Sequence, residues 1–221
     1  LNKLFDGIDL KYDDYMIKLF QWNSSDFIKS LFNDKYEDYF NKFDRDPLRE
    51  FVSNMDRDLD WVNKVLDLEK QFFLANHNLI YTDKMSMANA VEVRVPFLDD
   101  DLVNFANNLP PFLKQNKFKS KYILKKSMES FLPKDVIYRS KAGFNLPIRT
   151  WIKNELNDFV HNILSYKNIK NRGLFNPNKI HNLIEANKKG EIDASHAILS
   201  LVFQELWMQI FIDKKALVKL L

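Results

Sequence analysis

Hydrophobic residues recur every three or four positions along most of the chain, which is the spacing of one face of an α-helix. Clear examples lie at residues 61–72, 148–163 and 198–210. The alternation of apolar and polar residues that indicates a β-strand is almost absent. The sequence is therefore predicted to be mainly α-helical. Aromatic residues at helical spacing, such as Trp61 and Phe72, are interpreted as core residues rather than as a ligand cage.

Prolines, glycines and capping residues indicate where helices begin and end. Asn176 and Pro177 predict a helix start, because asparagine caps a helix and proline suits its first position, and Gly190 predicts its end. Pro47 is placed at a first helical position for the same reason, and Asn76-His77-Asn78 is interpreted as a turn. A buried helix face is expected over four apolar positions, Leu102, Val103, Ala106 and Leu109.

The stretch from Lys114 to Lys126 is strongly basic, with six lysines and no acidic residue. Such a run could bind phosphate or nucleic acid. The interleaved Tyr122, Ile123 and Leu124 instead favour an amphipathic helix with a solvated basic face. We take the second interpretation.

Residues 81–99 combine the signals of a helix, an extended segment and a second helix. Asp83 is predicted to cap the first helix and Asp99 the second. Between them, Glu92 and Arg94 alternate with valines, and Pro96 excludes the helical region for the residue before it. Side chains two positions apart on an extended backbone leave it on the same side. Glu92 and Arg94 are therefore expected to face the same way.

The Glu92–Arg94 pair has two interpretations. It is either a structural salt bridge that orients the segment, or part of a site wall that presents a carboxylate and a guanidinium to a polar substrate. Structural ion pairs also carry perturbed charges, so spacing alone favours the salt bridge.

The composition of the 221-residue chain narrows the function classes. A hydrophobic content of 46% is ordinary for a globular protein. No apolar run approaches the ~20 residues that span a bilayer, and no signal peptide is visible. The absence of cysteine excludes disulfides and a thiol nucleophile, and a net charge of +3 is too small to imply nucleic-acid binding. We expect a cytoplasmic protein with no membrane or nucleic-acid partner.

Several common catalytic and binding motifs are missing from the chain. It has neither a G-x-x-x-x-G-K-[ST] nor a G-x-G-x-x-G phosphate loop. Its four histidines are scattered, with no pair at metal-ligand spacing, so no metal site is predicted. The chain begins at Leu1 rather than at methionine, so we expect a piece of a longer protein.

Two motifs resemble the synthetase domain of the asparagine synthetase family. The first is D-K-M-S-M-A…V-E-V-R-V-P-F-L-D, from Asp83 to Asp99. The second is L-P-K-D-V-I-Y-R-S-K-A-G-F-N-L-P, from Leu132 to Pro147, which is similar to the family's L-P…R-x-K-x-G-F…P loop. Their order and separation fit the family, and the resemblance runs roughly from Asp13 to Phe211.

The resemblance implies that residues 1–221 are the helical C-terminal portion of an α/β adenine-nucleotide-hydrolase-like (PP-loop ATP pyrophosphatase) synthetase domain. The family's PP-loop and N-terminal glutaminase domain have no counterpart in this chain and are expected upstream. The implied reaction is that of asparagine synthase (glutamine-hydrolysing). ATP and Mg²⁺, bound mainly by the upstream part, activate the aspartate carboxylate as an acyl-adenylate, and ammonia from glutamine attacks it. The fragment alone is expected to be inactive, and a homodimer is possible.

The resemblance also implies roles for individual residues. Lys141 matches the lysine of the R-x-K-x-G-F loop and is expected to stabilise charge on the leaving pyrophosphate. Asp83, Glu92, Arg94 and Arg139 match further motif positions and are expected to shape the substrate cleft.

One difference from the family motif leaves the identity of the acceptor substrate undetermined. A Pro-Asp-Asp precedes the first motif in much of the family, whereas this chain has Ala75-Asn76-His77. The change is similar to a subgroup met in bacterial surface-polysaccharide biosynthesis, so an amidotransferase acting on a sugar or another carboxylate is an alternative. His77 is interpreted as a turn residue rather than a substrate contact. A non-catalytic helical binding module is a further alternative, and a Ser-Gly-Gly-x-Asp-Ser loop upstream would distinguish the enzyme from it.

Overall fold

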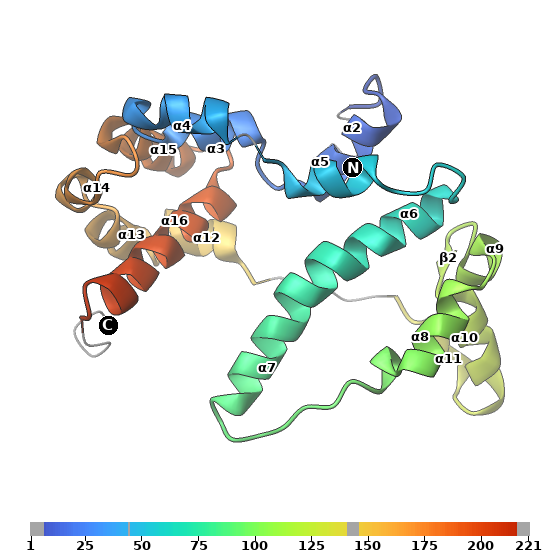
Figure 1. Cartoon of the computed structure of the whole chain (residues 1–221). Helices are drawn as coiled ribbons and strands as arrows, with labels where there is room; N and C mark the ends of the chain where they lie inside the picture. The colour runs from blue at the N-terminus through green and yellow to red at the C-terminus, as the bar shows by residue number, and fades with distance from the viewer. Residues whose placement is uncertain (1–6, 44, 141–145, 216–221) are drawn as a thin grey trace. The chain divides into compact units, whose positions relative to one another are not determined.

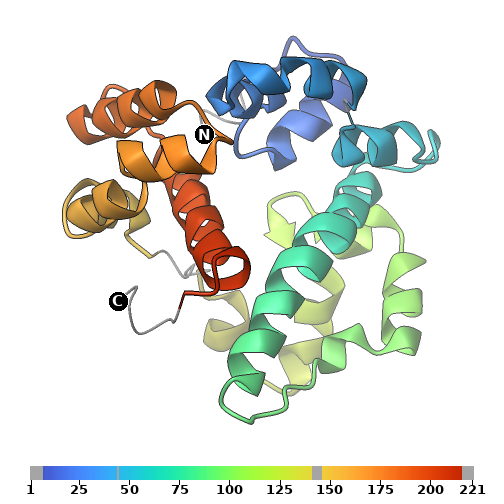
Figure 2. The same cartoon turned by 60° about the vertical axis from the view of Figure 1, so that its left-hand side comes forward.

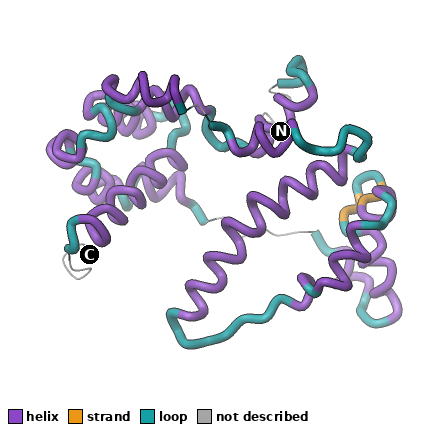
Figure 3. Tube along the Cα trace, in the orientation of Figure 1, coloured by secondary structure: helices purple, strands orange, loops and turns teal. Residues whose placement is uncertain are grey.

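The computed structural model describes residues 7–43, 45–140 and 146–215. The chain divides into two compact units, and each is considered by itself. Residues 1–46 and 144–221 form the first, here called the terminal unit, and residues 47–143 form the central unit. Helices dominate both, and the described residues include two short strands (Figure 3). The prediction of a mainly α-helical chain is confirmed.

The terminal unit contains the hydrophobic core of the described residues. Helix α16 packs against α12, α13 and α15, and Ile180 and Ile198 are fully buried in this core. Its helical elements are α2 (Tyr12–Phe20), α3 (Ser25–Leu31), η1 (Asp34–Tyr36), α4 (Glu37–Lys42), α12 (Ile148–Lys153), α13 (Asn157–Ile163), α14 (Tyr166–Arg172), α15 (Pro177–Lys189), α16 (Ser195–Trp207) and η5 (Met208–Ile212).

The predicted ends of α15 are confirmed. The Asn176 side chain accepts hydrogen bonds from the backbone N–H groups of Asn178 and Lys179, at 3.0 and 3.3 Å. Pro177 occupies the first helical position, where its missing N–H costs nothing. Gly190 ends the helix in the left-handed region, with φ of 79°.

The expected single helix over residues 148–163 is wrong, because the structure has two. Asn154 leaves the helical region, with φ of −117° and ψ of −87°, and ends α12. The backbone N–H of Asn157 then bonds to the Asn154 carbonyl at 3.1 Å as α13 begins. The turn lets Ile152 and Val160, from different helices, share one core.

The helix over Ser195–Ile212 is the one in the described residues long and apolar enough, by length and composition, to cross a membrane. It carries the buried polar residues Glu205 and Gln209, and its first part packs against α12 and α13. We interpret it as the core helix of the terminal unit.

The central unit is built around one long helix, which both views show as an uninterrupted coil (Figures 1 and 2). This coil comprises α6, η2 and α7, and η2 has the wider π-helical geometry. The elements of the unit are α5 (Pro47–Ser53), α6 (Trp61–Leu68), η2 (Glu69–Leu79), α7 (Ile80–Met87), η3 (Pro96–Leu98), α8 (Asp100–Asn107), α9 (Pro111–Lys114), β1 (Gln115–Asn116), β2 (Lys119–Ser120), α10 (Tyr122–Ser127), η4 (Met128–Ser130) and α11 (Lys134–Tyr138).

The predicted turn at residues 76–78 is wrong, since these residues lie inside η2. Their polar side chains bond locally on the exposed helix surface instead of turning the chain. Asn76 Nδ2 donates to the Gln71 carbonyl at 2.8 Å, and the His77 ring stacks on Phe73 with centroids 4.9 Å apart. Helical geometry therefore continues through a segment that contains no glycine or proline to stop it.

The buried face expected on α8 is also wrong. Leu102 is 41% exposed, and α8 has no buried residue. The apolar spacing does give a helix, but its apolar face is only partly covered, because Val103 and Leu109 are half-buried while Leu102 and Ala106 are exposed. Periodicity alone reports which face is apolar, not what packs against it.

The helix expected between Lys114 and Lys126 is only partly correct. Strands β1 and β2 pair antiparallel, with Asn116 opposite Lys119. Within the basic stretch, the chain becomes helical after these strands only where α10 begins. Lys117 and Lys121 have φ of 53° and 55°, in the left-handed region that side chains other than glycine seldom adopt. No glycine announces this hairpin, which is why its turn was not predicted.

Candidate functional site

The Glu92–Arg94 ion pair forms as the extended backbone predicts. Arg94 Nη2 lies 2.5 Å from Glu92 Oε1, and the two side chains are 86% and 67% exposed. Val95 has φ of −119° and ψ of 81°, so Pro96 holds the residue before it out of the helical region. The pair is therefore a surface feature of the central unit and faces solvent in the described structure.

The chain enters this extended segment through a Schellman motif at the end of α7. The Val91 N–H bonds to the Ser86 carbonyl and the Ala90 N–H to the Met87 carbonyl, both at 3.0 Å. Ala90 occupies the left-handed position, with φ of 55°. Glycine normally fills that position, because a side chain there is strained.

The extended segment leads into α8 through Asp99, whose capping role is confirmed. Its carboxylate accepts the Leu102 N–H at 3.1 Å. The two ends of the Glu92–Arg94 segment are thus fixed by a helix terminator and a helix cap. That arrangement sets the direction in which both charged side chains leave the backbone.

Asp83 does not cap a helix, so that prediction is wrong. It lies within α7, four residues after the helix has continued from η2, and its backbone carbonyl accepts a bond from Ser86 Oγ at 3.0 Å. The carboxylate is exposed on the helix surface. The sequence signal failed because the preceding polar residues do not end the helix.

Arg139 lies directly after α11, where it adopts an extended conformation with φ of −57° and ψ of 149°. It is exposed. Lys141, the residue with the predicted catalytic role, lies outside the described residues. Its role remains a prediction from the motif.

A polar network that the sequence did not reveal lies immediately before Arg139. The Tyr138 hydroxyl donates to Glu129 Oε1 at 2.5 Å, and Lys126 Nζ lies 3.1 Å from the same oxygen. Lys125 Nζ stands over the Tyr138 ring, 6.0 Å from its centroid. These contacts tie α10, η4 and α11 together. Lys126 and Glu129 have the i,i+3 spacing of neighbours on a helix, whereas Tyr138 is nine residues from Glu129 and only the fold brings it to the carboxylate.

The charges in this network stabilise one another. The hydrogen bond from Tyr138, followed by that from Lys126, lowers the pKa of Glu129. The same carboxylate raises the pKa of Tyr138 and that of Lys126. The network is therefore an ionised carboxylate held between a phenol and an ammonium.

Two further lysines of the central unit converge between the long helix and α8. Lys70 donates to Asn107 Oδ1 at 2.9 Å, and Lys114 donates to Asn63 Oδ1 at 2.7 Å and to the Asn107 carbonyl at 2.9 Å. Burial, and then repulsion by Lys70, lowers the pKa of Lys114. Asp67 pairs with Lys70 at 2.7 Å. These contacts brace α6 and η2 against α8 and α9.

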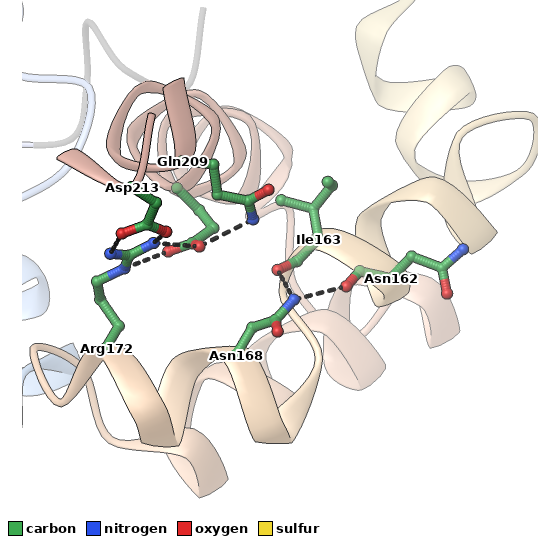
Figure 4. Close-up of polar contacts among 7 residues, drawn as sticks. Asn162, Ile163, Asn168, Arg172, Gln209 and Asp213 are labelled. Carbon is green, nitrogen blue, oxygen red and sulfur yellow. Dashed lines mark hydrogen bonds and ion pairs between the residues drawn. The ribbon is translucent and has the colours of Figure 1, made fainter. Parts of the chain in front are cut away.

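The terminal unit has its own polar cluster, which links α14 to the C-terminal helix (Figure 4). Arg172 donates to both carboxylate oxygens of Glu205 and to both of Asp213, at 2.9–3.1 Å. Gln209 donates to Glu205 at 2.9 Å. None of the predicted site residues belongs to this cluster, and the pairing of its charged groups with one another indicates a structural role.

An open cavity of about 400 Å³ also lies in the terminal unit. An ion pair between Lys179 and Asp34, 3.0 Å apart, lines it together with Asp26, Lys29 and Glu37. It contains none of the residues that the motifs single out.

Neither a grouped set of metal-ligating side chains nor a glycine-rich phosphate loop is found among the described residues. Gly173 and Gly190 both end helices in the left-handed region and do not line a phosphate loop. Across residues 7–43, 45–140 and 146–215, no three His, Asp or Glu side chains are grouped so that they could hold a metal ion.

Comparison with known proteins agrees with the two motifs. The family model for asparagine synthase matches residues 4–210. Asparagine synthetase (glutamine-hydrolyzing) 1 of Bacillus subtilis (strain 168) is 33% identical over 154 residues, which are 70% of this chain and 24% of that protein. A putative asparagine synthetase (glutamine-hydrolyzing) of Mycobacterium tuberculosis (strain ATCC 25618 / H37Rv) is 28% identical over 155 residues, with the same two coverages.

A more distant similarity links the chain to amidase chyE of Penicillium rubens (strain ATCC 28089 / DSM 1075 / NRRL 1951 / Wisconsin 54-1255). The two are 28% identical over 109 residues, which are 47% of this chain and 16% of the amidase. No solved structure matches the chain at a significant level. The chain spans about a quarter of the length of the first two relatives.

Proposed function

The chain belongs to the asparagine synthase family, and from this premise we propose that it is the helical C-terminal part of the synthetase domain of an ATP-dependent, amide-forming ligase. The family match over residues 4–210 is the observation that carries the proposal. It includes the Glu92–Arg94 segment and the R-x-K motif at Arg139. Both belong to the central unit, which supports a common role.

The proposed reaction joins a carboxylate to ammonia. Aspartate is the proposed acceptor, activated as an acyl-adenylate, and glutamine is the proposed source of ammonia, as the names of the bacterial relatives suggest. ATP and Mg²⁺ would be held mainly by the family's PP-loop, which lies upstream of the region that this chain resembles and has no counterpart in this sequence. The absence of cysteine agrees with a cytoplasmic location.

Within this proposal, Lys141 supplies positive charge at the leaving pyrophosphate, and the exposed pair Glu92 and Arg94 faces the acceptor together with Arg139. Asp83 has a weaker claim, because it lies on the helix before the extended segment and not within it. A pair that is mostly exposed contributes little to stability, which supports a role in binding for Glu92 and Arg94.

The test uses the full-length protein with ATP, Mg²⁺ and either glutamine or ammonia. Aspartate should give asparagine together with equal amounts of AMP and pyrophosphate. A panel of sugar carboxylates and other acids, tested in parallel, covers the alternative acceptors. A folded full-length protein that forms neither AMP nor pyrophosphate with any carboxylate would favour the non-catalytic binding module.

A further inference from the structure

Tyr138 and Glu129 make a contact that neither the sequence motifs nor the family match assigns to the reaction. The Tyr138 hydroxyl lies 2.5 Å from Glu129 Oε1, and Lys126 holds the same carboxylate from α10. The residue after Tyr138 is Arg139, which opens the R-x-K motif. The network therefore stands at the point where the chain leaves α11 for that motif.

Helix α11 has few other means of holding its C-terminal end in place. It is five residues long and contains no buried residue. Val136 is 51% exposed and Tyr138 is 39% exposed. A helix this short is not stable without tertiary contacts, and α11 packs against η4, which contains Glu129. The Tyr138–Glu129 hydrogen bond joins these two elements through their side chains.

The chemistry of the contact suits a fixed anchor. Its acceptor is an ionised carboxylate, and such charge-assisted hydrogen bonds are stronger than those between neutral groups. The donor lies on a rigid ring rather than on a flexible chain, so the bond defines one position of the α11 terminus. Lys126, one helical turn before Glu129, neutralises the carboxylate from α10 rather than from Tyr138's own helix.

We propose that Tyr138 is a positioning residue of the ligase site: through its hydrogen bond to Glu129 it fixes the end of α11 and thereby holds Arg139 for the reaction. This inference rests on the proposed function. Misplacing a reacting or binding group by about 1 Å can cost on the order of a hundredfold in rate. Tyr138 itself need not touch the substrate.

The first test compares Tyr138→Phe with wild type in the full-length protein. The variant keeps the ring and its contact with Lys125 but removes the hydroxyl. We expect kcat to fall about tenfold while KM for ATP changes less than about twofold, because the displaced Arg139 faces the acceptor and not the nucleotide. Melting temperature should stay nearly constant. Tyr166→Phe is the matched control, since Tyr166 is an exposed tyrosine on α14 with no hydroxyl hydrogen bond among the described residues.

Variants of Glu129 test whether the hydrogen bond is responsible. Glu129→Gln retains an oxygen acceptor for Tyr138 and should recover part of the lost kcat relative to Glu129→Ala. The Tyr138→Phe/Glu129→Ala double variant should be no slower than either single variant, since both remove the same contact. Wild-type kcat in Tyr138→Phe, or losses that multiply in the double variant, would overturn the proposal.

Hydrogen exchange separates this inference from the proposed function. In Tyr138→Phe, the backbone amides of residues 136–139 should exchange about fivefold faster, because one side-chain hydrogen bond no longer opposes local opening. The Tyr166→Phe control should leave them unchanged. If full-length wild type lacks ligase activity, the proposed function fails. Faster amide exchange at residues 136–139 in Tyr138→Phe would then still support the role of Tyr138 in fixing the end of α11. Unchanged exchange in this variant would overturn that role.

Discussion

Arg172 binds Glu205 through two parallel hydrogen bonds, from Nε at 3.1 Å and from Nη2 at 2.9 Å. The side chains are 19% and 6% exposed, so the pair is largely removed from water. The geometry is the bidentate one that a planar guanidinium makes with a carboxylate. It joins α14 to α16 within the terminal unit.

Replacing Glu205 should destabilise the terminal unit strongly. In Glu205→Gln, one carboxylate oxygen becomes an amide N–H that faces the guanidinium, and a largely buried cation loses half of its counter-charge. Removing one partner of a buried ion pair typically costs 3–5 kcal/mol. Because Arg172 keeps its contact with Asp213, we expect a loss at the lower end, about 3 kcal/mol. Chemical denaturation measures the loss, with the exposed Glu155→Gln as control. A loss below about 1 kcal/mol would contradict the buried-pair interpretation.

Asp213 should make stability depend on pH at the acid end. Hydrogen bonds from Arg172 lower the pKa of the Asp213 carboxyl below its ordinary value of 3.8. Because the native pKa is the lower one, the stabilisation is fully present above about pH 3.8 and is lost as pH falls through the native pKa. Asp213→Asn should therefore lower the melting temperature near pH 7, and this effect should shrink progressively as the pH falls below 3.8. The exposed Asp9→Asn should show no such trend, and an effect of Asp213→Asn that stays the same throughout the acid titration would contradict the ion pair.

Ala90 offers a stabilising substitution. It occupies the left-handed position of the Schellman motif, where a Cβ atom costs roughly 1 kcal/mol. Ala90→Gly should raise the free energy of unfolding by about 0.5–1 kcal/mol. Ala88→Gly is the matched control, because Ala88 is right-handed and glycine there should destabilise. If Ala90→Gly and Ala88→Gly lowered the free energy of unfolding by similar amounts, position 90 would not be strained.

Glu92 and Arg94 should couple only weakly in stability. Exposed ion pairs typically contribute less than about 1 kcal/mol, and both side chains are mostly exposed. A double-mutant cycle with Glu92→Ala and Arg94→Ala, measured by denaturation, should give a coupling energy below that value. The same variants in the full-length protein should lower kcat/KM for the acceptor if the pair faces the substrate. Unchanged kcat/KM would return the pair to a purely structural role.

Lys141→Ala should lower kcat of the full-length protein by ~100-fold or more, the scale of a lost electrostatic contact in the transition state. Turnover with ammonia as nitrogen donor is the appropriate assay, since it bypasses glutamine hydrolysis. Lys170→Ala, an exposed lysine on α14, is the control. Near-normal turnover in Lys141→Ala would remove this residue from the proposed mechanism.

Local signals in the sequence predicted local structure well. Asn176, Pro177 and Gly190 mark the ends of α15, and Asp99 marks the start of α8, because capping depends on residues within one helical turn. Non-local features were not accessible in this way. The polar residues around His77 resemble a turn, yet η2 accommodates them, and the Tyr138–Glu129 bond depends on how α11 folds back on η4.

In the candidate site, too, local features were predictable and non-local ones were not. The shared orientation of Glu92 and Arg94 was predicted because an extended backbone determines which side each side chain faces. Asp83 was placed in the right segment but in the wrong structural role, since its role depended on whether the helix before it had ended. The Tyr138–Glu129 hydrogen bond that precedes Arg139 could not be predicted, because Tyr138 lies on α11 and Glu129 on η4.

The π-helical stretch Glu69–Leu79 sets the angular phase between the two ends of the long helix. Each residue of an α-helix turns the chain by about 100°, so a segment wound more widely changes the direction in which every later side chain points. Deleting one residue from this stretch would rotate Asp83 and the exit to Glu92 by about a quarter-turn or more around the axis, while α6 kept its own contacts. The orientation of the motif is thus encoded in the winding of a segment that contains none of its residues.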